Sequence, residues 1–165
     1  MPTRPATPAD FPAILALNAA VVHLTSPLDA ERLAALHAQA ALHRVAEHDG
    51  RVVAFLLALR EGADYASPNY RWFAARYPRF LYVDRVVVAA AAPRLGFGSA
   101  LYADLFAHAA AQDVATLACE YDLEPPNPRS AQFHAKHGFC EVGQQTLYGG
   151  QKSVSLQIAM PHAPA

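Results

Sequence analysis

The chain has 165 residues, a formal net charge of −1, and 53% hydrophobic against 16% charged residues. This composition excludes a mainly disordered chain, and the near-neutral charge gives no electrostatic footprint for nucleic acid or an anionic membrane. No apolar run reaches membrane-spanning length without a charge, and the first ten residues lack the apolar core of a secretion signal. We therefore expect one globular domain over residues 1–165, in the cytoplasm, with neither nucleic acid nor membrane as a partner.

The N-terminal part predicts a short strand followed by two helices. The strand covers Arg4–Thr7, where Pro5 either confines it to a sheet edge or leaves it irregular. A second helix is expected to start at Asp29. The first helix should be capped by Asp10, run to about Val22, and turn four apolar side chains inward, namely Ile14, Leu15, Leu17 and Val21.

A hairpin and an aromatic segment come next. Asp49-Gly50 is the preferred chemistry for a two-residue turn, here between strands at Ala41–His48 and Arg51–Arg60. The segment from Glu61 to Phe80 has no clean period. The segment and Tyr82 just beyond it hold seven of the sixteen aromatic residues of the chain: Tyr65, Tyr70, Trp72, Phe73, Tyr77, Phe80 and Tyr82. Two interpretations stay open, a lid or pocket wall and a plug for one end of the sheet.

The centre of the chain predicts a strand, a glycine turn and a helix. Tyr82–Val88 is β-branched and aromatic, as in a buried central strand. The turn has two glycines before a helix, whose first-turn N–H groups and dipole suit an anion. The sequence lacks the Gly-Lys-Ser/Thr of a P-loop and the third small residue of a dinucleotide fingerprint. The turn is Pro93-Arg94-Leu95-Gly96-Phe97-Gly98-Ser99.

The C-terminal part predicts a strand, a helix and a second hairpin. The strand is Val114–Tyr121, and the helix begins after the cap Asn127 and ends before Gly138 in left-handed conformation. Two strands, Phe139–Leu147 and Lys152–Met160, then join around Gly149-Gly150. On the helix, three polar side chains share one face, which points either to solvent or to a ligand: Asn127, Ser130 and His134.

The cysteines and histidines predict no metal site. Cys119 and Cys140 follow no metal or redox spacing, and Cys119 is expected as a buried reduced thiol. His134 and His137 are three residues apart but have no further ligands nearby in the sequence.

Taken together, the glycine turn and the second motif resemble the GNAT family of acyl-CoA-dependent N-acetyltransferases. The family's phosphate loop is Gln/Arg-x-x-Gly-x-Gly/Ala, which Gly96 and Gly98 match, although Pro93 stands at the usual Gln/Arg position. The second pattern is Asn-x-x-Ala/Ser, then an aliphatic or aromatic residue, usually Tyr, and Gly-Phe after three more. The residues that fit it are Asn127, Ser130, Phe133, Gly138 and Phe139, and His134 stands at the usual tyrosine.

The resemblance implies an α/β (α+β) fold with a mixed, mostly antiparallel sheet of about six to seven strands and about four flanking helices. It also implies a V-shaped opening between the central strands, in which the thioester of acetyl-CoA lies. Backbone N–H groups of the glycine turn would bind the pyrophosphate, and Asn127 with Ser130 the lower part of the cofactor. The strand would hold the pantetheine arm. In full, the implied cofactor contacts are Val86, Val87, Val88, Arg94, Leu95, Gly96, Phe97, Gly98, Ser99, Asn127 and Ser130.

The resemblance implies an enzyme in which an amine attacks the acetyl thioester directly. A protonated amine needs a base, and Asp84 and Glu120 are the candidates, either of which could instead be structural. A backbone N–H near Val87 or Val88 would stabilise the carbonyl oxygen. The thiolate needs a proton donor, for which His134 stands in the tyrosine's place, with three alternatives: Tyr82, Tyr102 and Tyr121.

The acceptor is expected to be a small-molecule or peptide amine. Its pocket is placed at the aromatic segment, with Tyr70, Trp72 and Tyr82 as contacts. A non-catalytic acyl-CoA sensor is the alternative, because the turn and the tyrosine position depart from the family pattern. A nucleotide-binding protein of another fold is disfavoured by the failed motifs. The C-terminal hairpin could stay in one subunit or be exchanged in a homodimer.

Overall fold

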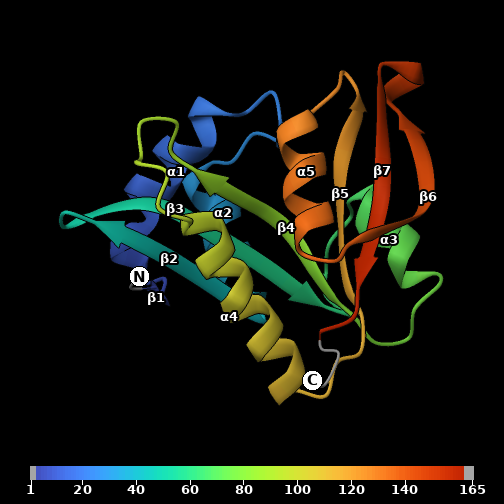
Figure 1. The fold of residues 1–165 in the computed structure, drawn as a ribbon, viewed down its shortest axis with the longest axis horizontal. Helices are drawn as coiled ribbons and strands as arrows, with labels where there is room; N and C mark the ends of the chain where they lie inside the picture. Colours follow the sequence, from blue (N-terminus) through green and yellow to red (C-terminus); the bar gives the residue numbers. More distant parts are fainter. Residues whose placement is uncertain (1–2, 162–165) are drawn as a thin grey trace. The chain divides into compact units, whose positions relative to one another are not determined.

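The computed structural model describes residues 3–161 and contains a seven-stranded sheet in the order β1-β2-β3-β4-β5-β7-β6 (Figure 1). The strands are β1 (Thr3–Pro5), β2 (Leu42–His48), β3 (Arg51–Arg60), β4 (Leu81–Val88), β5 (Leu117–Glu124), β6 (Cys140–Leu147) and β7 (Lys152–Ala159). The α-helices are α1 (Phe11–Ala20), α2 (Ala30–Gln39), α3 (Pro68–Ala74), α4 (Phe97–Ala111) and α5 (Pro128–Lys136). Strand β5 runs parallel to β4, whereas β1–β2, β2–β3, β5–β7 and β6–β7 are antiparallel. The predicted mixed, mostly antiparallel sheet is confirmed.

The described chain divides into two compact units. One consists of residues 3–59 and 83–108, the other of residues 60–82 and 109–161. The three boundaries fall inside β3 after Leu59, inside β4 after Tyr82 and inside α4 after His108. The interpretation of residues 1–165 as a single domain stays a prediction.

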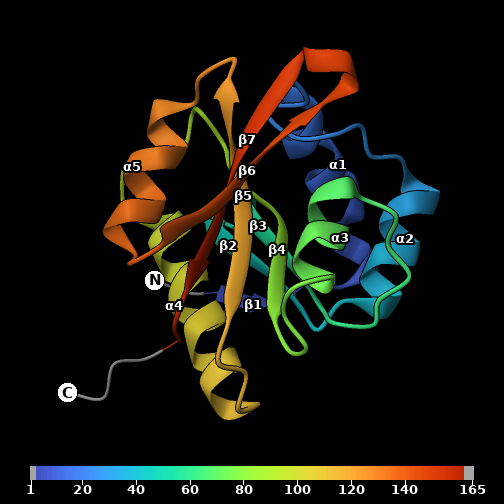
Figure 2. The same ribbon diagram turned by 90° about the vertical axis from the view of Figure 1, so that its right-hand side faces the viewer.

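In the first unit, α1 and α2 cover one face of the β2–β3 hairpin and α4 the other (Figures 1 and 2). The turn between the strands has positive φ at both central residues, 50° at Asp49 and 73° at Gly50, which matches the twist of a two-residue hairpin. Asp29 caps α2 by accepting the N–H of Arg32 at 2.8 Å. The predicted hairpin and the predicted start of the second helix are confirmed.

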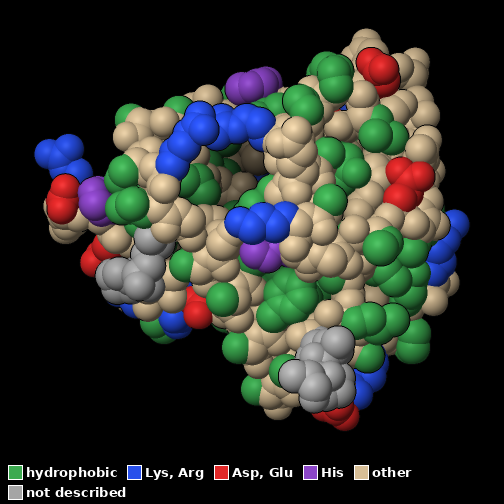
Figure 3. Space-filling model, viewed as in Figure 1, with side chains coloured by type: hydrophobic (Ala, Val, Ile, Leu, Met, Phe, Trp, Pro, Cys, Tyr) green, Lys and Arg blue, Asp and Glu red, His purple; other side chains and the backbone are tan. Residues whose placement is uncertain are grey.

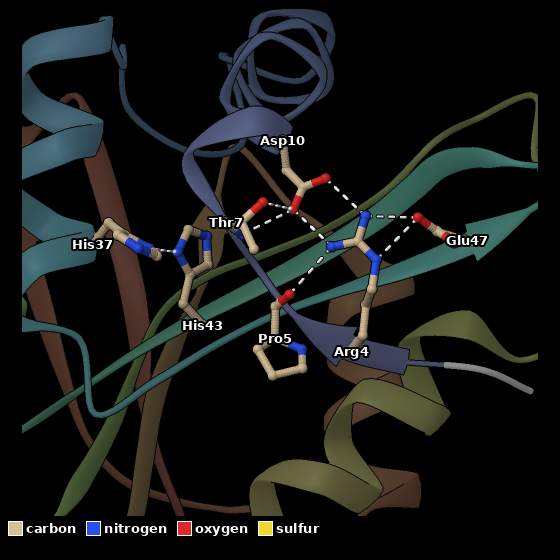
Figure 4. A network of polar contacts seen from close by, with 7 residues as sticks. All are labelled: Arg4, Pro5, Thr7, Asp10, His37, His43 and Glu47. Atoms are coloured by element: carbon tan, nitrogen blue, oxygen red, sulfur yellow. Dashed lines mark hydrogen bonds and ion pairs between the residues drawn. The ribbon is translucent and has the colours of Figure 1, made fainter.

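The start of α1 differs from the expectation because Asp10 has other partners (Figure 4). A short 3-10 turn, Pro8–Asp10, precedes the helix, and the Asp10 side chain makes no capping bond to α1. Instead it accepts two bonds of 2.8 Å from Arg4 and one of 2.8 Å from the N–H of Thr7. The same guanidinium donates to Glu47. Bonding to Arg4 lowers the pKa of Asp10 to about 2.

The inner face of α1 also differs from the expectation. Ile14 is buried as predicted, but the second buried position is Asn18, 1% exposed, rather than a leucine. The Asn18 amide donates to Ser26 O at 2.9 Å and accepts from Arg85 at 3.1 Å. A buried amide with both ends bonded is stable inside a core, which hydrophobic periodicity does not reveal.

A partly buried histidine, His37, and a buried one, His43, form a pair in this unit (Figure 4). The Nδ1 atoms of His37 and His43 lie 2.7 Å apart, so one ring donates and the other accepts. His43 packs edge-on against Phe55. Burial, and then the neighbouring His37, lower the pKa of His43 from 6.5 to about 4.

This pair predicts a loss of stability in mild acid. Below the unfolded pKa of 6.5 the unfolded chain takes up a proton at His43 that the folded chain refuses down to about pH 4, so stability falls as the pH falls through this window. Between pH 7 and 5 we expect a loss of about 2 kcal/mol in the free energy of unfolding, which urea titrations measure. His43→Phe should remove most of this loss, while the exposed control His23→Gln should retain it. Asp10 titrates below the window. The lowered pKa of His134 adds a loss that all of these variants keep, so the test is the difference between them: a loss in His43→Phe equal to that of the wild type would refute the assignment.

In the second unit, α3 covers one face of β5, β7 and β6, and α5 covers the other (Figure 2). Strand β5 was predicted over Val114–Tyr121 but runs from Leu117 to Glu124, because Asp122 and Glu124 pair with Val154 and Ser153 of β7. Hydrophobicity alone ended the strand too early. The second hairpin is confirmed, with positive φ at Gly149 and Gly150.

The surface carries charges of both signs. On the face shown in Figure 3, Lys and Arg side chains and Asp and Glu side chains both lie among apolar and neutral atoms. None of the helices within residues 3–161 combines the length and the apolar character needed to cross a bilayer.

Candidate functional site

The glycine turn leads directly into α4. The helix was expected to follow Ser99 but begins at Phe97, inside the predicted turn, so Gly98 and Ser99 lie in its first turn. Ala100 donates the first helical bond, to Gly96 O at 2.9 Å, and the N–H groups of residues 97–99 precede it. These N–H groups and the helix dipole suit an anion at this end of α4, and pyrophosphate binding here stays a prediction.

Gly96 has a backbone conformation that favours glycine. Its φ is 83°, and a Cβ atom added there would meet nothing within 4 Å. The glycine is therefore needed for conformation, and space is open above the turn. The flanking Arg94 and Leu95 are exposed. An open turn with a helix N-terminus and an exposed guanidinium fits a pyrophosphate.

The end of β4 supplies the other expected cofactor contacts of this unit. Val87 is buried, Val86 is partly buried and Val88 is 38% exposed. Beyond them, Ala89 donates to Val53 O of β3 at 2.8 Å. The expected backbone bonds from these valines to a pantetheine arm stay predictions.

Asp84 lies in a buried ion pair. Its carboxylate is 2.6 Å from Nε of Arg85, and the two side chains are 3% and 1% exposed. Arg85 also donates to Asn18 and to the backbone oxygen and hydroxyl of Ser26. The ion pair supports the structural alternative for Asp84, and its catalytic role stays a prediction.

Glu120 lies in the middle of β5, on the face that α3 covers. Its Oε1 accepts from the hydroxyl of Tyr82 at 2.9 Å and from Nδ2 of Asn69 at 3.1 Å. The register explains the first contact, since Tyr82 pairs with Ala118, and Ala118 and Glu120 point to the same side. The parallel ladder between β4 and β5 pairs Leu81 with Leu117 and Tyr82 with Ala118.

Two more polar residues on this face were missed from sequence. Asp122, 6% exposed, lies two residues beyond Glu120 and 3.3 Å from Nζ of Lys152. Burial raises the pKa of Asp122, and the lysine opposes this shift. Gln145 of β6 bonds to Asn69. The period of two along β5 could have marked Asp122, but no local signal marks Asn69 or Gln145.

The predicted stripe on α5 is only partly exposed. Asn127 caps the helix by accepting the N–H of Ser130 at 3.3 Å. His134 is 3% exposed, so it points into the unit rather than to solvent. Its Nδ1 lies 2.8 Å from the carbonyl oxygen of Ser130 and 3.2 Å from the hydroxyl. The helix ends as predicted, with Gly138 at φ 82°.

His134 stacks on Tyr121 of β5. The ring centroids are 5.8 Å apart and the planes differ by 28°. The Tyr121 hydroxyl accepts from Gln157 at 3.2 Å. Burial lowers the pKa of His134, an effect that the bond to Ser130 opposes.

The aromatic segment forms a packed cluster around α3. Tyr70 is 3% exposed, donates to Arg60 O at 2.6 Å and accepts from the N–H of Ala63 at 3.0 Å. Its ring packs against that of Tyr82, with the centroids 5.4 Å apart. Burial raises the pKa of Tyr70. These contacts support the packing interpretation for Tyr70, and its role in acceptor binding stays a prediction.

Trp72 packs against β6. A Cβ atom built on Gly143 would lie 2.5 Å from the indole, so this glycine lets the ring sit on the strand. The guanidinium of Arg76 covers the ring, 3.9 Å from its centroid. The indole is partly exposed, and its role in acceptor binding also stays a prediction.

A sequence model of the acetyltransferase (GNAT) family matches residues 10–139. The chain belongs to the GNAT family. It is an N-acetyltransferase that uses acetyl-CoA, and the motifs and seven-stranded sheet described above are those of this family.

Solved structures show the same GNAT fold. Ribosomal-protein-alanine N-acetyltransferase from Brucella melitensis is 25% identical, with a TM-score of 0.72 over 97% of this chain and 99% of that one. Naa20 of Chaetomium thermophilum with a bisubstrate analogue is 20% identical, with a TM-score of 0.78 over 97% and 86%. YncA of Salmonella typhimurium, solved with acetyl-CoA, is 20% identical, with a TM-score of 0.73 over 100% and 96%. Among curated proteins, none is significantly similar in sequence.

Proposed function

We propose that this GNAT enzyme transfers the acetyl group of acetyl-CoA to a primary amine by direct attack, with Glu120 as the general base. The observation that carries the proposal is the contrast between the two carboxylates. Asp84 is neutralised by a buried arginine, whereas Glu120 is held by neutral donors, Tyr82 and Asn69, that leave it able to take a proton. Acetyl-CoA supplies the activated acetyl thioester.

The residues of the chain then have three tasks. The α4 turn binds the pyrophosphate through backbone N–H groups, with Arg94 at its edge. Glu120 takes a proton from the amine, which is mostly protonated at neutral pH because its reference pKa is about 10. A donor must finally protonate the departing thiolate.

The tautomer of His134 argues against the donor role that the family resemblance implies. A carbonyl oxygen only accepts, so the contact with Ser130 O places the proton on Nδ1 and the lone pair on Nε2. Because burial lowers the pKa of His134, the ring is neutral at pH 7. A neutral ring in this tautomer accepts a proton at Nε2. Tyr121, stacked on it and with its own hydroxyl hydrogen to donate, is the better donor.

Tyr121→Phe should therefore lower kcat by about tenfold or more, and His134→Phe by less. The measurement is thiol release at saturating substrates, with the exposed Tyr148→Phe as the matched control. A wild-type rate for Tyr121→Phe would remove Tyr121 from the mechanism. A larger loss in His134→Phe than in Tyr121→Phe would restore the imidazole as the donor.

The function itself is tested with a panel of amines. The panel should include small amines and short peptides, among them peptides with N-terminal alanine, because the Brucella melitensis relative is a ribosomal-protein-alanine N-acetyltransferase. Acetylated product identified by mass spectrometry supports the proposal. Acetyl-CoA binding without turnover on any amine would favour the acyl-CoA sensor instead. The C-terminal hairpin is expected either to stay in one subunit or to be exchanged in a homodimer. Analytical sedimentation would distinguish a monomer from a homodimer.

A further inference from the structure

A chain of two amides, the buried Asn69 and the partly buried Gln145, leads from β6 through α3 to the proposed base. Gln145 Nε2 donates to Asn69 Oδ1 at 3.0 Å, and Asn69 Nδ2 donates to Glu120 Oε1 at 3.1 Å. Asn69 is 8% exposed. The three residues come from three different elements and lie within one unit.

The sheet register places these residues on one face. Leu156 of β7 pairs with Glu120 of β5 on one side and with Gly143 of β6 on the other, so all three point the same way. Gln145 is two residues beyond Gly143 and shares that face. Glu120, Leu156 and Gly143 thus form a row across β5, β7 and β6, and this face of the sheet brings the proposed base and Gln145 under α3.

Helix α3 is fixed over this row at two points. Trp72 sits on Gly143, and Asn69, three residues earlier on the helix, reaches Gln145, two residues further along the strand. Residues three apart on a helix lie on the same face, and so do residues two apart on a strand. The contacts of Trp72 and Asn69 therefore join the same face of α3 to the same face of β6. Ser67 caps the helix by accepting the N–H of Tyr70. The Asn69 side chain thus starts from a fixed backbone.

The hydrogen bonds also fix the orientation of the Asn69 amide. An ionised carboxylate only accepts, so Asn69 must present its NH₂ to Glu120. Its carbonyl oxygen must then face a donor, which is the NH₂ of Gln145. A flipped amide would lose both bonds, and it would put an oxygen against the carboxylate.

We propose that Asn69 is a positioning residue for the general base and that Gln145 sets its amide, so that the Glu120 carboxylate is held in one rotamer for proton transfer. The proposal rests on the role of Glu120 proposed above. The competing explanation is a structural one, in which the amides only hold α3 on the sheet.

The test compares kcat and KM of single and double variants. Asn69→Ala should lower kcat by about tenfold with the KM for acetyl-CoA unchanged, since misplacing a catalytic group affects the chemical step. Gln145→Ala should lower kcat by a smaller factor. Gln144→Ala is the matched control, because the neighbouring glutamine is exposed and bonds to Glu141 instead, and it should keep the wild-type rate.

The double variant Glu120→Gln/Asn69→Ala should be no slower than Glu120→Gln, because a residue that acts through the base has no effect once the base is gone. Multiplied losses would overturn the positioning role and leave Glu120 as the base. A wild-type rate for Glu120→Gln alone would overturn the base and the positioning role together. Absence of turnover in the wild-type chain would refute the function itself.

A reciprocal exchange separates positioning from folding. In Glu120→Gln/Asn69→Asp the new carboxylate faces the new amide, so the hydrogen bond is kept with its direction reversed. We expect a higher Tm than in Asn69→Asp alone, where two carboxylates face each other, but no recovery of kcat. Recovery of kcat together with Tm would mean that Glu120 is not the base, and would overturn the base and the positioning role together.

Discussion

Glu120→Gln is expected to lower kcat by about 10²–10⁴-fold while acetyl-CoA binds with unchanged affinity. The amide has nearly the same shape and keeps an oxygen for Tyr82 and Asn69, but it cannot take a proton from the amine. Turnover should be measured by thiol release and binding by calorimetry. Glu124→Gln is the matched control, since it changes an exposed glutamate at the end of the same strand.

The contrasting variant is Asp84→Asn. It removes the carboxylate partner of Arg85, whose side chain is 1% exposed. A buried charge without its partner strongly destabilises the fold. We expect a lower Tm but a normal rate per folded molecule. Should Asp84→Asn stop turnover in folded protein while Glu120→Gln does not, the two carboxylates would have to exchange roles.

Gly96→Val is expected to weaken acetyl-CoA binding by about tenfold or more, because a β-branched residue resists φ of 83° and its side chain would occupy the open space over the first N–H groups of α4. The same substitution at Gly62 is the matched control. Gly62 has φ of 80°, is also exposed, and also has nothing within 4 Å of an added Cβ.

Both variants should therefore lose similar stability, about 1–2 kcal/mol, but only Gly96→Val should lose affinity. Calorimetry gives the affinity and urea unfolding the stability. Equal acetyl-CoA affinity in the two variants would mean that the α4 turn does not bind the pyrophosphate.

Local chemistry made the ends of most elements predictable. Asp49-Gly50, Asn127 and Gly138 each force one backbone conformation or satisfy one helix end, and each lies where its residue type indicated. The glycine turn before α4 belongs to this group, since Gly96 needs positive φ whatever the rest of the chain does. Family membership was also readable, because both motifs are local.

The surroundings of Glu120, the proposed base, were not predictable in this way. Asn69, Glu120 and Gln145 meet only because β5, β7 and β6 adopt one register and α3 docks on it. No pattern in the neighbouring residues of the sequence indicates any of these pairings. Likewise, in the sequence Asn18 interrupts an apolar helix face. Its burial is explained only by the hydrogen bond from Arg85, which lies far along the chain. Hydrophobic patterns indicate which face is inside but not which polar groups satisfy each other there.

Trp72 of α3 packs on β6 and can serve as an intrinsic fluorescence probe of this contact. It is the only tryptophan among the 165 residues, and Cys140, on the same strand as Gly143, is the exposed one of the two free cysteines. Burial raises the pKa of the Cys119 thiol, so an alkylating dye would select Cys140. Energy transfer from the indole to that dye would then follow, in real time, whether α3 lifts from β6 as an amine enters.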